Sequence, residues 1–189
     1  MARATTFAAA FAATLLAAAD GRAADRPADP AHPGAASSGP RQAAMSAAEF
    51  VRRVAMTDLF EVEAGELAMR RGQHGEIKGY GQMLATDHQK SLQQLKELMK
   101  DQDVVPKSLD PDHATVVARL REMPEGEFDR SFVAMQIEAH DRAIALLERY
   151  AESGDDPKLR AFARESLTPN RHHLEIARRL ARGYGEWKG

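Results

Sequence analysis

Three histidines and one glutamate occupy positions where helical patterns of apolar residues call for core side chains. His88 falls between Leu84 and Leu92, so its imidazole shares their helical face. The same replacement of an apolar by a polar side chain recurs in three other segments, at Glu61, His140 and His173. Imidazole nitrogens together with a carboxylate are a suitable ligand set for zinc, iron or copper. These residue types therefore indicate a candidate metal site.

Four long amphipathic segments carry these side chains, one in each. The first begins at a capping box, Ser46 to Glu49, in which each end residue can hydrogen-bond to the backbone of the other. The long helices are expected over residues 46–71, 75–102, 127–153 and 157–183, with a short crossover helix from Asp110-Pro111. A bend is expected at Pro169. The sequence has no sustained period-two alternation, which predicts an all-α fold.

The lengths of the connections predict how these helices are arranged. Short, long and short joins are typical of an antiparallel four-helix bundle of the ferritin-like kind, with a long crossover connection between the second and third long helices. A simple up-down bundle with an extra connector helix uses the same segments and stays open. At 1.5 Å rise per residue, the four polar side chains lie roughly 16–24 Å from the nearest short turn, near mid-bundle. Inward side chains at one level can meet, because packed helices approach to about 8–10 Å.

The same four side chains allow an interpretation without an ion. Buried histidines and a carboxylate can satisfy one another by hydrogen bonds and fix the register of the helices. Asp87 lies about 100° round the helix from His88 and is expected to orient that ring or a neighbour rather than to bind an ion itself. A conventional di-iron oxidase is not predicted, because its Glu-x-x-His pairs are missing: Ala85 and Ile137 stand three residues before His88 and His140.

Composition limits the remaining functions. The 189 residues are 43% apolar, which is enough for one domain with a core. A formal net charge of -2 without a basic stripe predicts no nucleic-acid partner. The chain has no cysteine, which excludes disulfides, thiolate metal ligands and thiol catalysis. It also has no glycine-rich phosphate loop and no nucleophile elbow, so no catalytic residue and no organic cofactor is predicted.

The N-terminal region has the composition of a targeting segment. Residues 1–23 resemble a signal peptide: Arg3 precedes a short apolar run, and Gly21 and Ala23 are small residues before a cleavage point. A buried N-terminal helix is the alternative, although Ala and Leu cover every face of it. Residues 24–45 form an expected disordered tether rich in Pro and Ala, residues 46–183 the domain, and residues 184–189 a tail. No apolar span follows the signal, which predicts a periplasmic protein and leaves envelope association open.

Several runs, in this order along the chain, carry a resemblance to a known family. They are F-E-V-E-A-G-E-L-A around Glu61, M-L-A-T-D-H ending at His88, E-F-D-R-S-F with the later A-H at His140, and H-H-L-E-I-A around His173. The chain resembles the domain of unknown function 4142 family over roughly residues 49–181. The resemblance implies a ferritin-like fold and an exported protein, and members are often labelled outer-membrane proteins. It implies no established activity.

Two functions follow from these observations. The first is an exported, periplasmic helical-bundle protein of unestablished activity, acting as a non-catalytic envelope or stress-related module. The second is a metal-binding ferritin-like protein that uses a cluster in the bundle centre, formed by Glu61, His88, His140 and His173. Neither defines a protein partner, and a homo-oligomer stays open.

Overall fold

The described part of the chain is helical. In the computed structural model it comprises residues 45–100 and 103–183, so the expected signal peptide, nearly all of the tether and the tail lie outside it. Within these residues there are five helices and no strand, which confirms the predicted all-α class. The helices are α1 (Ala47–Arg71), α2 (Gly75–Leu98), α3 (Pro111–Glu122), α4 (Glu125–Ser153) and α5 (Pro157–Gly183). None of the described helices has both the length and the apolar character required to cross a bilayer.

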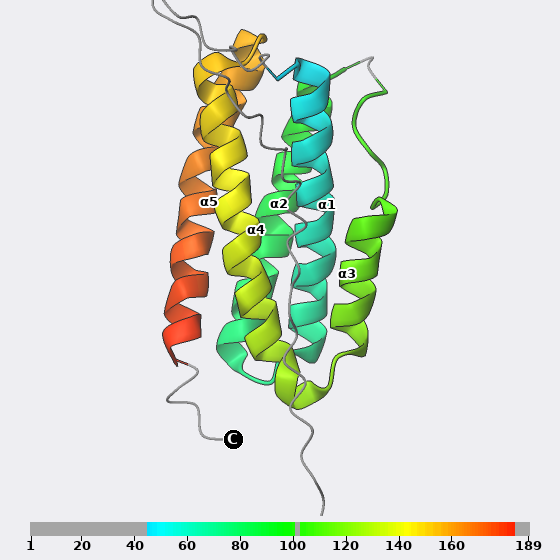
Figure 1. The fold of residues 1–189 in the computed structure, drawn as a ribbon, viewed down its shortest axis with the longest axis vertical. Helices are drawn as coiled ribbons and strands as arrows, with labels where there is room; N and C mark the ends of the chain where they lie inside the picture. Colours follow the sequence, from blue (N-terminus) through cyan, green and yellow to red (C-terminus); the bar gives the residue numbers. More distant parts are fainter. Residues whose placement is uncertain (1–44, 101–102, 184–189) are drawn as a thin grey trace, which may run out of the picture. The chain divides into compact units, whose positions relative to one another are not determined.

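Two helical hairpins make up most of the domain (Figure 1). α1 packs along α2 and α4 packs along α5, while α3 runs beside α1 in the connection between the hairpins. The first hairpin is unusually close because two glycines face each other. A Cβ atom added to Gly65 would lie 2.5 Å from the carbonyl oxygen of Gly81, and one added to Gly81 would lie 2.6 Å from that of Gly65. Side chains at these two positions would therefore force the helices apart.

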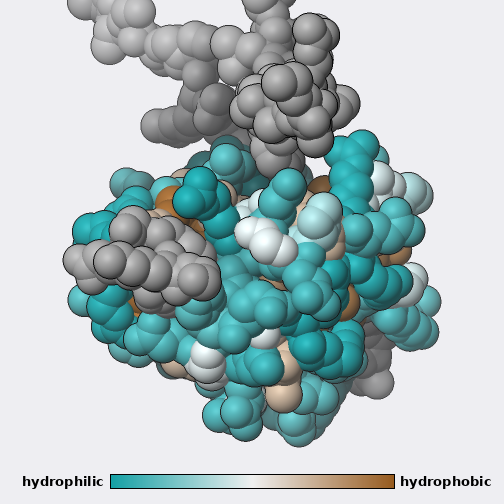
Figure 2. Space-filling view, turned by 90° about the horizontal axis from the view of Figure 1, so that it is seen from below, coloured by the Kyte–Doolittle hydropathy of each residue, from teal (hydrophilic) through white to brown (hydrophobic). Residues whose placement is uncertain are grey.

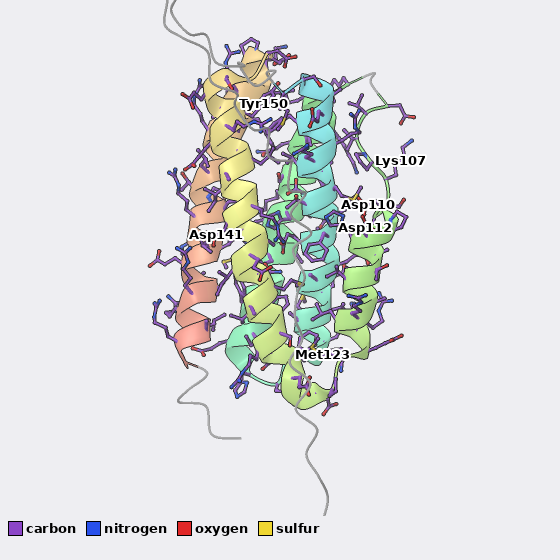
Figure 3. All side chains as sticks on the ribbon, viewed as in Figure 1. Lys107, Asp110, Asp112, Met123, Asp141 and Tyr150 are labelled. Carbon is purple, nitrogen blue, oxygen red and sulfur yellow. The ribbon has the colours of Figure 1, made fainter. Side chains whose placement is uncertain are left out.

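Both ends of the α3 connection are tied to other elements. Asp110, labelled with Met123 in Figure 3, caps the start of α3 by accepting a hydrogen bond from the backbone N–H of His113. At the other end, the Arg71 guanidinium donates to the carbonyl oxygens of Leu120, Arg121 and Met123. This guanidinium fixes the C-terminal end of α3, whose carbonyls have no helical partner, against α1.

Asp129 of α4 fixes the turn between α1 and α2. Its carboxylate accepts hydrogen bonds from the backbone N–H groups of Gln73 and His74, at 3.0 and 3.2 Å, and lies 2.7 Å from Nδ1 of His74. His74 is the N-cap of α2 and makes no side-chain cap of its own. A buried carboxylate from the second hairpin therefore supplies the negative charge that favours the start of α2.

The core consists of two apolar clusters with a polar layer between them. One cluster contains the inward side chains from Met45 to Ala55 of the first hairpin, together with Leu147, Tyr150 and Phe162 of the second. The ring of Tyr150, labelled near one end of α4 in Figure 3, stacks on Phe50 at 3.8 Å between centroids. The other cluster contains side chains toward the opposite end of each long helix, including Phe60, Leu84, Phe132 and Ala177. The buried polar side chains that lie between the two clusters include Asp58, Glu61, His88, His140 and His173.

The surface at the end of the domain shown in Figure 2 is mostly hydrophilic, with scattered apolar side chains. Among the described residues, the large apolar side chains that are exposed are Met69 and Leu98. The apolar side chains are therefore largely inside.

Two helix ends differ from the sequence-based expectation. α2 ends at Leu98 rather than near residue 102, and α4 begins at Glu125 rather than at residue 127. The earlier start follows from Pro124, whose carbonyl accepts from the N–H groups of Glu127 and Phe128 and so places Gly126 in the first helical turn. α5 runs to Gly183 with Pro169 inside it, as expected, and the bend at Pro169 stays a prediction.

Candidate metal centre

His88 of α2 is held by a buried carboxylate from α1. Its Nδ1 lies 2.7 Å from Oδ1 of Asp58, and both side chains are 4% exposed. Asp58 and His88 belong to adjacent helices of the first hairpin, so the pair forms where these helices pack. Within the described residues, the second ring nitrogen, Nε2, is buried and has no hydrogen-bond partner. The ring is therefore fixed on one side and open toward the interior.

His140 of α4 and His173 of α5 face each other inside the second hairpin. Nε2 of His140 lies 3.3 Å from Nδ1 of His173. Each ring has an outer partner as well: Nδ1 of His140 lies 3.0 Å from the carbonyl oxygen of Gln136, and Nε2 of His173 lies 3.1 Å from Oδ2 of Asp87. Tyr80 adds a further contact, because its hydroxyl donates to the backbone carbonyl of His173. Both rings are therefore held in place by α2 or by their own helix.

The three rings converge at one point of the core. A nitrogen from each of them lies within 4.8 Å of the nitrogens from the other two. The ring centroids are 5.3–5.7 Å apart and no pair of rings is stacked face to face. His88 comes from the first hairpin and the other two from the second, so the cluster exists only where the hairpins meet.

The outer partners determine which nitrogens carry protons. A carbonyl oxygen can only accept, so Nδ1 of His140 is the protonated nitrogen, and the Asp87 carboxylate likewise requires a proton on Nε2 of His173. In neutral rings, the two nitrogens that face each other at 3.3 Å then both present lone pairs. Asp58 fixes His88 in the same way and leaves its Nε2 as the inner nitrogen. When His88 is neutral as well, three lone pairs point into a shared volume, as in sites where histidines bind a metal and donate outward to second partners.

Burial keeps two of these rings neutral. Desolvation, helped by the positive charge of protonated His88, lowers the pKa of His140 to about 3 and that of His173 to about 4. Burial would also lower the pKa of His88, but the hydrogen bond and the negative charge of Asp58 outweigh it and raise that pKa above its ordinary value. At neutral pH the cluster therefore holds two neutral rings beside one that has a strong affinity for a proton.

Glu61 lies in the same polar region but not in the convergent group. Its side chain is completely buried on α1, and within the described residues neither carboxylate oxygen has a hydrogen-bond partner. Burial raises its pKa, against the opposing charge of His88. The carboxylate oxygens are outside the set of ligand atoms that meet within 4.8 Å. A buried carboxylate beside His88 is either protonated or available to a cation.

The structure thus brings together three of the four residues that the sequence indicated, and it adds partners that sequence reasoning missed. Asp87 was expected to orient His88 or a neighbour, and it holds His173. The partner of His88 is Asp58, which was not singled out. The signal was present, since Asp58 stands four residues after Val54 and three before Glu61 on the same helical face. The carbonyl of Gln136 was also missed, because backbone groups leave no mark in a sequence.

These features define a class of protein: an all-helical domain with three histidines at the centre of its core. The chain belongs to the family described as domain of unknown function (DUF4142), whose model matches residues 32–180. This match confirms the family resemblance seen in the sequence. The chain is also similar to the crystal structure of a DUF305 fragment from Deinococcus radiodurans, with a TM-score of 0.62 and 17% identity over 71% of this chain and 95% of that chain. That likeness concerns the fold alone. No curated protein matches the chain.

Proposed function

We propose that this domain binds one transition-metal ion through His88, His140 and His173. The observation that carries the proposal is the convergence of three inner ring nitrogens whose outer nitrogens all have acceptors. Two lone pairs facing each other at 3.3 Å repel unless a proton or a cation lies between them. The low pKa values of these two rings disfavour the proton. A cation satisfies all three nitrogens at once.

The spacing suits ions that imidazole prefers, namely zinc, iron or copper. Two nitrogens bound to zinc at about 2.0–2.1 Å in tetrahedral geometry lie about 3.3–3.4 Å apart. This matches the 3.3 Å between His140 and His173. Glu61, the fourth residue of the predicted ligand set, lies outside the convergent group. Its buried carboxylate offers a negative charge near His88 rather than a ligand atom. Asp58 and Asp87 act on the rings, fixing their orientation and raising their basicity.

A second candidate is the non-catalytic module, in which the polar layer only fixes the register of the helices. The buried Asp58–His88 pair at 2.7 Å favours it, since such a pair specifies a unique packing without any ion. The two candidates differ in their response to His88→Leu. If the polar layer only fixes the register of the helices, His88→Leu should lower stability equally with and without metal, because Asp58 would be left unpaired in both cases. If the layer binds a metal, the loss of stability should be larger when metal is present.

We also propose a specific arrangement of the helices and a location for the protein in the cell. We infer a ferritin-like four-helix bundle of α1, α2, α4 and α5 with α3 in the crossover, which the packing of α1 on α4 and of α2 on α5 supports. We also propose an exported, periplasmic protein. The composition of residues 1–45 supports it, with a signal peptide over 1–23 and a tether after it.

The decisive experiment compares two adjacent histidines of α5. Untagged protein is tested for bound metal by elemental analysis, and its melting is followed with zinc, iron(II), copper(II) or a chelator. His173→Ala should abolish stoichiometric binding and the rise in melting temperature with metal, since an ion that binds only the folded state stabilises it. His172→Ala is the matched control, because His172 is exposed and should bind metal as the parent does. A parent protein whose melting ignores every ion and chelator would exclude the metal site.

A further inference from the structure

A cleft between α2 and α5 reaches the histidine cluster from the surface. Its volume is about 270 Å³, and His88 and His173 are among its lining residues. Both of these side chains are at most 3% exposed, so they lie at the inner end of the cleft. His140, the third ring, is not part of the lining. Two of the three rings of the candidate centre therefore border a space large enough for solvent and small solutes.

Most of the residues that line the cleft carry a polar group. Its remaining lining consists of charged side chains, hydroxyls, amides and one proline, namely Asp87, Lys90, Glu165, Ser91, Ser166, Gln94, Asn170 and Pro169. Pro169 has no N–H group to donate to the Glu165 carbonyl one turn earlier, so α5 lacks one helical hydrogen bond at the cleft. A space filled by packing would be lined by apolar side chains, as the two core clusters are. This lining instead offers donors and acceptors to a small polar occupant.

A smaller cavity adjoins the cleft and is lined by both polar and apolar side chains. It has a volume of about 20 Å³, shares Ser91, Ser166 and Asn170 with the cleft, and ends beside Asp58. This is enough for about one water molecule. Within the described residues, Oδ2 of Asp58 is buried without a hydrogen-bond partner. A water in this cavity would satisfy that oxygen, so the partner of His88 is itself supplied from the cleft side.

We propose that the bound ion keeps an open coordination position toward the α2–α5 cleft and takes there a small anion or oxygen-donor molecule from solvent. This inference rests on the proposed metal site. Three protein nitrogens leave a tetrahedral ion one position short, which is the arrangement of sites that bind an exchangeable ligand. Glu61 is outside the convergent group. Three neutral imidazoles also leave the charge of the ion uncompensated by its own ligands, which favours an anion in the remaining position.

The test uses cobalt(II), whose visible spectrum reports its coordination, with azide as the probe. The parent protein is loaded with cobalt and titrated with azide. Gln94→Trp places a large ring at the mouth of the cleft. Gln93→Trp is the matched control, because Gln93 is the neighbouring exposed glutamine of α2 and does not line the cleft. The expected result is a saturable spectral change in the parent and in both variants, with azide binding about tenfold slower in Gln94→Trp than in Gln93→Trp.

The outcomes separate this inference from the metal site itself. If no cobalt spectrum develops, the metal site is wrong and the open position is wrong with it. If cobalt binds stoichiometrically and azide leaves its spectrum unchanged, the metal site stands and the open position is overturned. If azide binds at the same rate to both tryptophan variants, the ligand does not reach the ion through this cleft. Slower removal of cobalt by a chelator from Gln94→Trp alone supports the cleft as the route.

Discussion

His140 and His173 differ from His88 in the sign of their effect on stability. The pKa values of the first two are lowered by burial, so the folded state binds fewer protons than the unfolded state as the pH falls below about 6.5. Their contribution to stability is then lost with falling pH. His88 and Glu61 have raised pKa values and act in the opposite sense, losing stability as the pH rises. The pH dependence of the stability of the whole protein is therefore the sum of two opposing contributions. A single substitution can remove part of one of them.

We expect His140→Gln to remove the contribution of this ring to the loss of stability at low pH. With a pKa near 3 in the folded state and about 6.5 unfolded, His140 costs about 2 kcal/mol of stability between pH 7 and pH 5. Glutamine does not titrate, so the difference in unfolding free energy between parent and variant should shrink by about that amount at pH 5. Urea unfolding in the presence of a chelator measures it. An unchanged difference at the two pH values would contradict the burial of a neutral ring.

The individual residues of the site were only partly predictable. A histidine on an apolar face can be read from spacing, which is how the three rings were found. The outer partners could not be assigned, because whether Asp87 reaches His88 or His173 depends on the rotation of α2 against α5. The metal ion stays a prediction.

At the level of helices, the contact of Gly65 with Gly81 sets how closely α1 and α2 pack. Gly65→Ala should destabilise the domain, because its new Cβ would lie 2.5 Å from a backbone carbonyl that cannot move alone. Overpacking of this kind costs about 1–3 kcal/mol, more than the gain of about 1 kcal/mol from alanine in a helix. Chemical denaturation provides the measurement.

Gly79→Ala is the control for this effect in α2. A Cβ at Gly79 would meet nothing within 4 Å, and the residue lies inside the same helix as Gly81. Only the helix propensity then changes, so this variant should gain about 0.5–1 kcal/mol. Equal effects of the two substitutions would mean that the close approach of α1 to α2 does not matter.

At the scale of the whole chain, export is the prediction that the sequence makes. The mature protein should begin at or near Ala24, because Gly21 and Ala23 are the small residues that precede a signal cleavage point. The intact mass of protein from the periplasmic fraction checks this. A full-length mass in that fraction would contradict it, and Ala23→Arg, which blocks cleavage, serves as the control.

The helical class and the family were predictable because both rest on long-range regularities of the sequence, namely apolar periodicity and ordered motifs such as the run ending at His88. The ends of the helices were less predictable from the sequence. The start of α4 depends on which N–H groups donate to the carbonyl of Pro124, and the spacing of apolar residues carries no information on such hydrogen bonds at a helix end.

The origin of the three rings in both hairpins has a kinetic consequence. Each hairpin joins neighbouring segments and can form from local contacts, whereas docking of the two hairpins closes a much longer loop and comes later in folding. An ion shared by His88, His140 and His173 can bind only after docking. We therefore expect bound zinc to slow unfolding, with little change in the folding rate, as stopped-flow measurements with zinc and with a chelator would record. The ion would then lengthen the lifetime of the docked state without speeding the folding steps that precede docking.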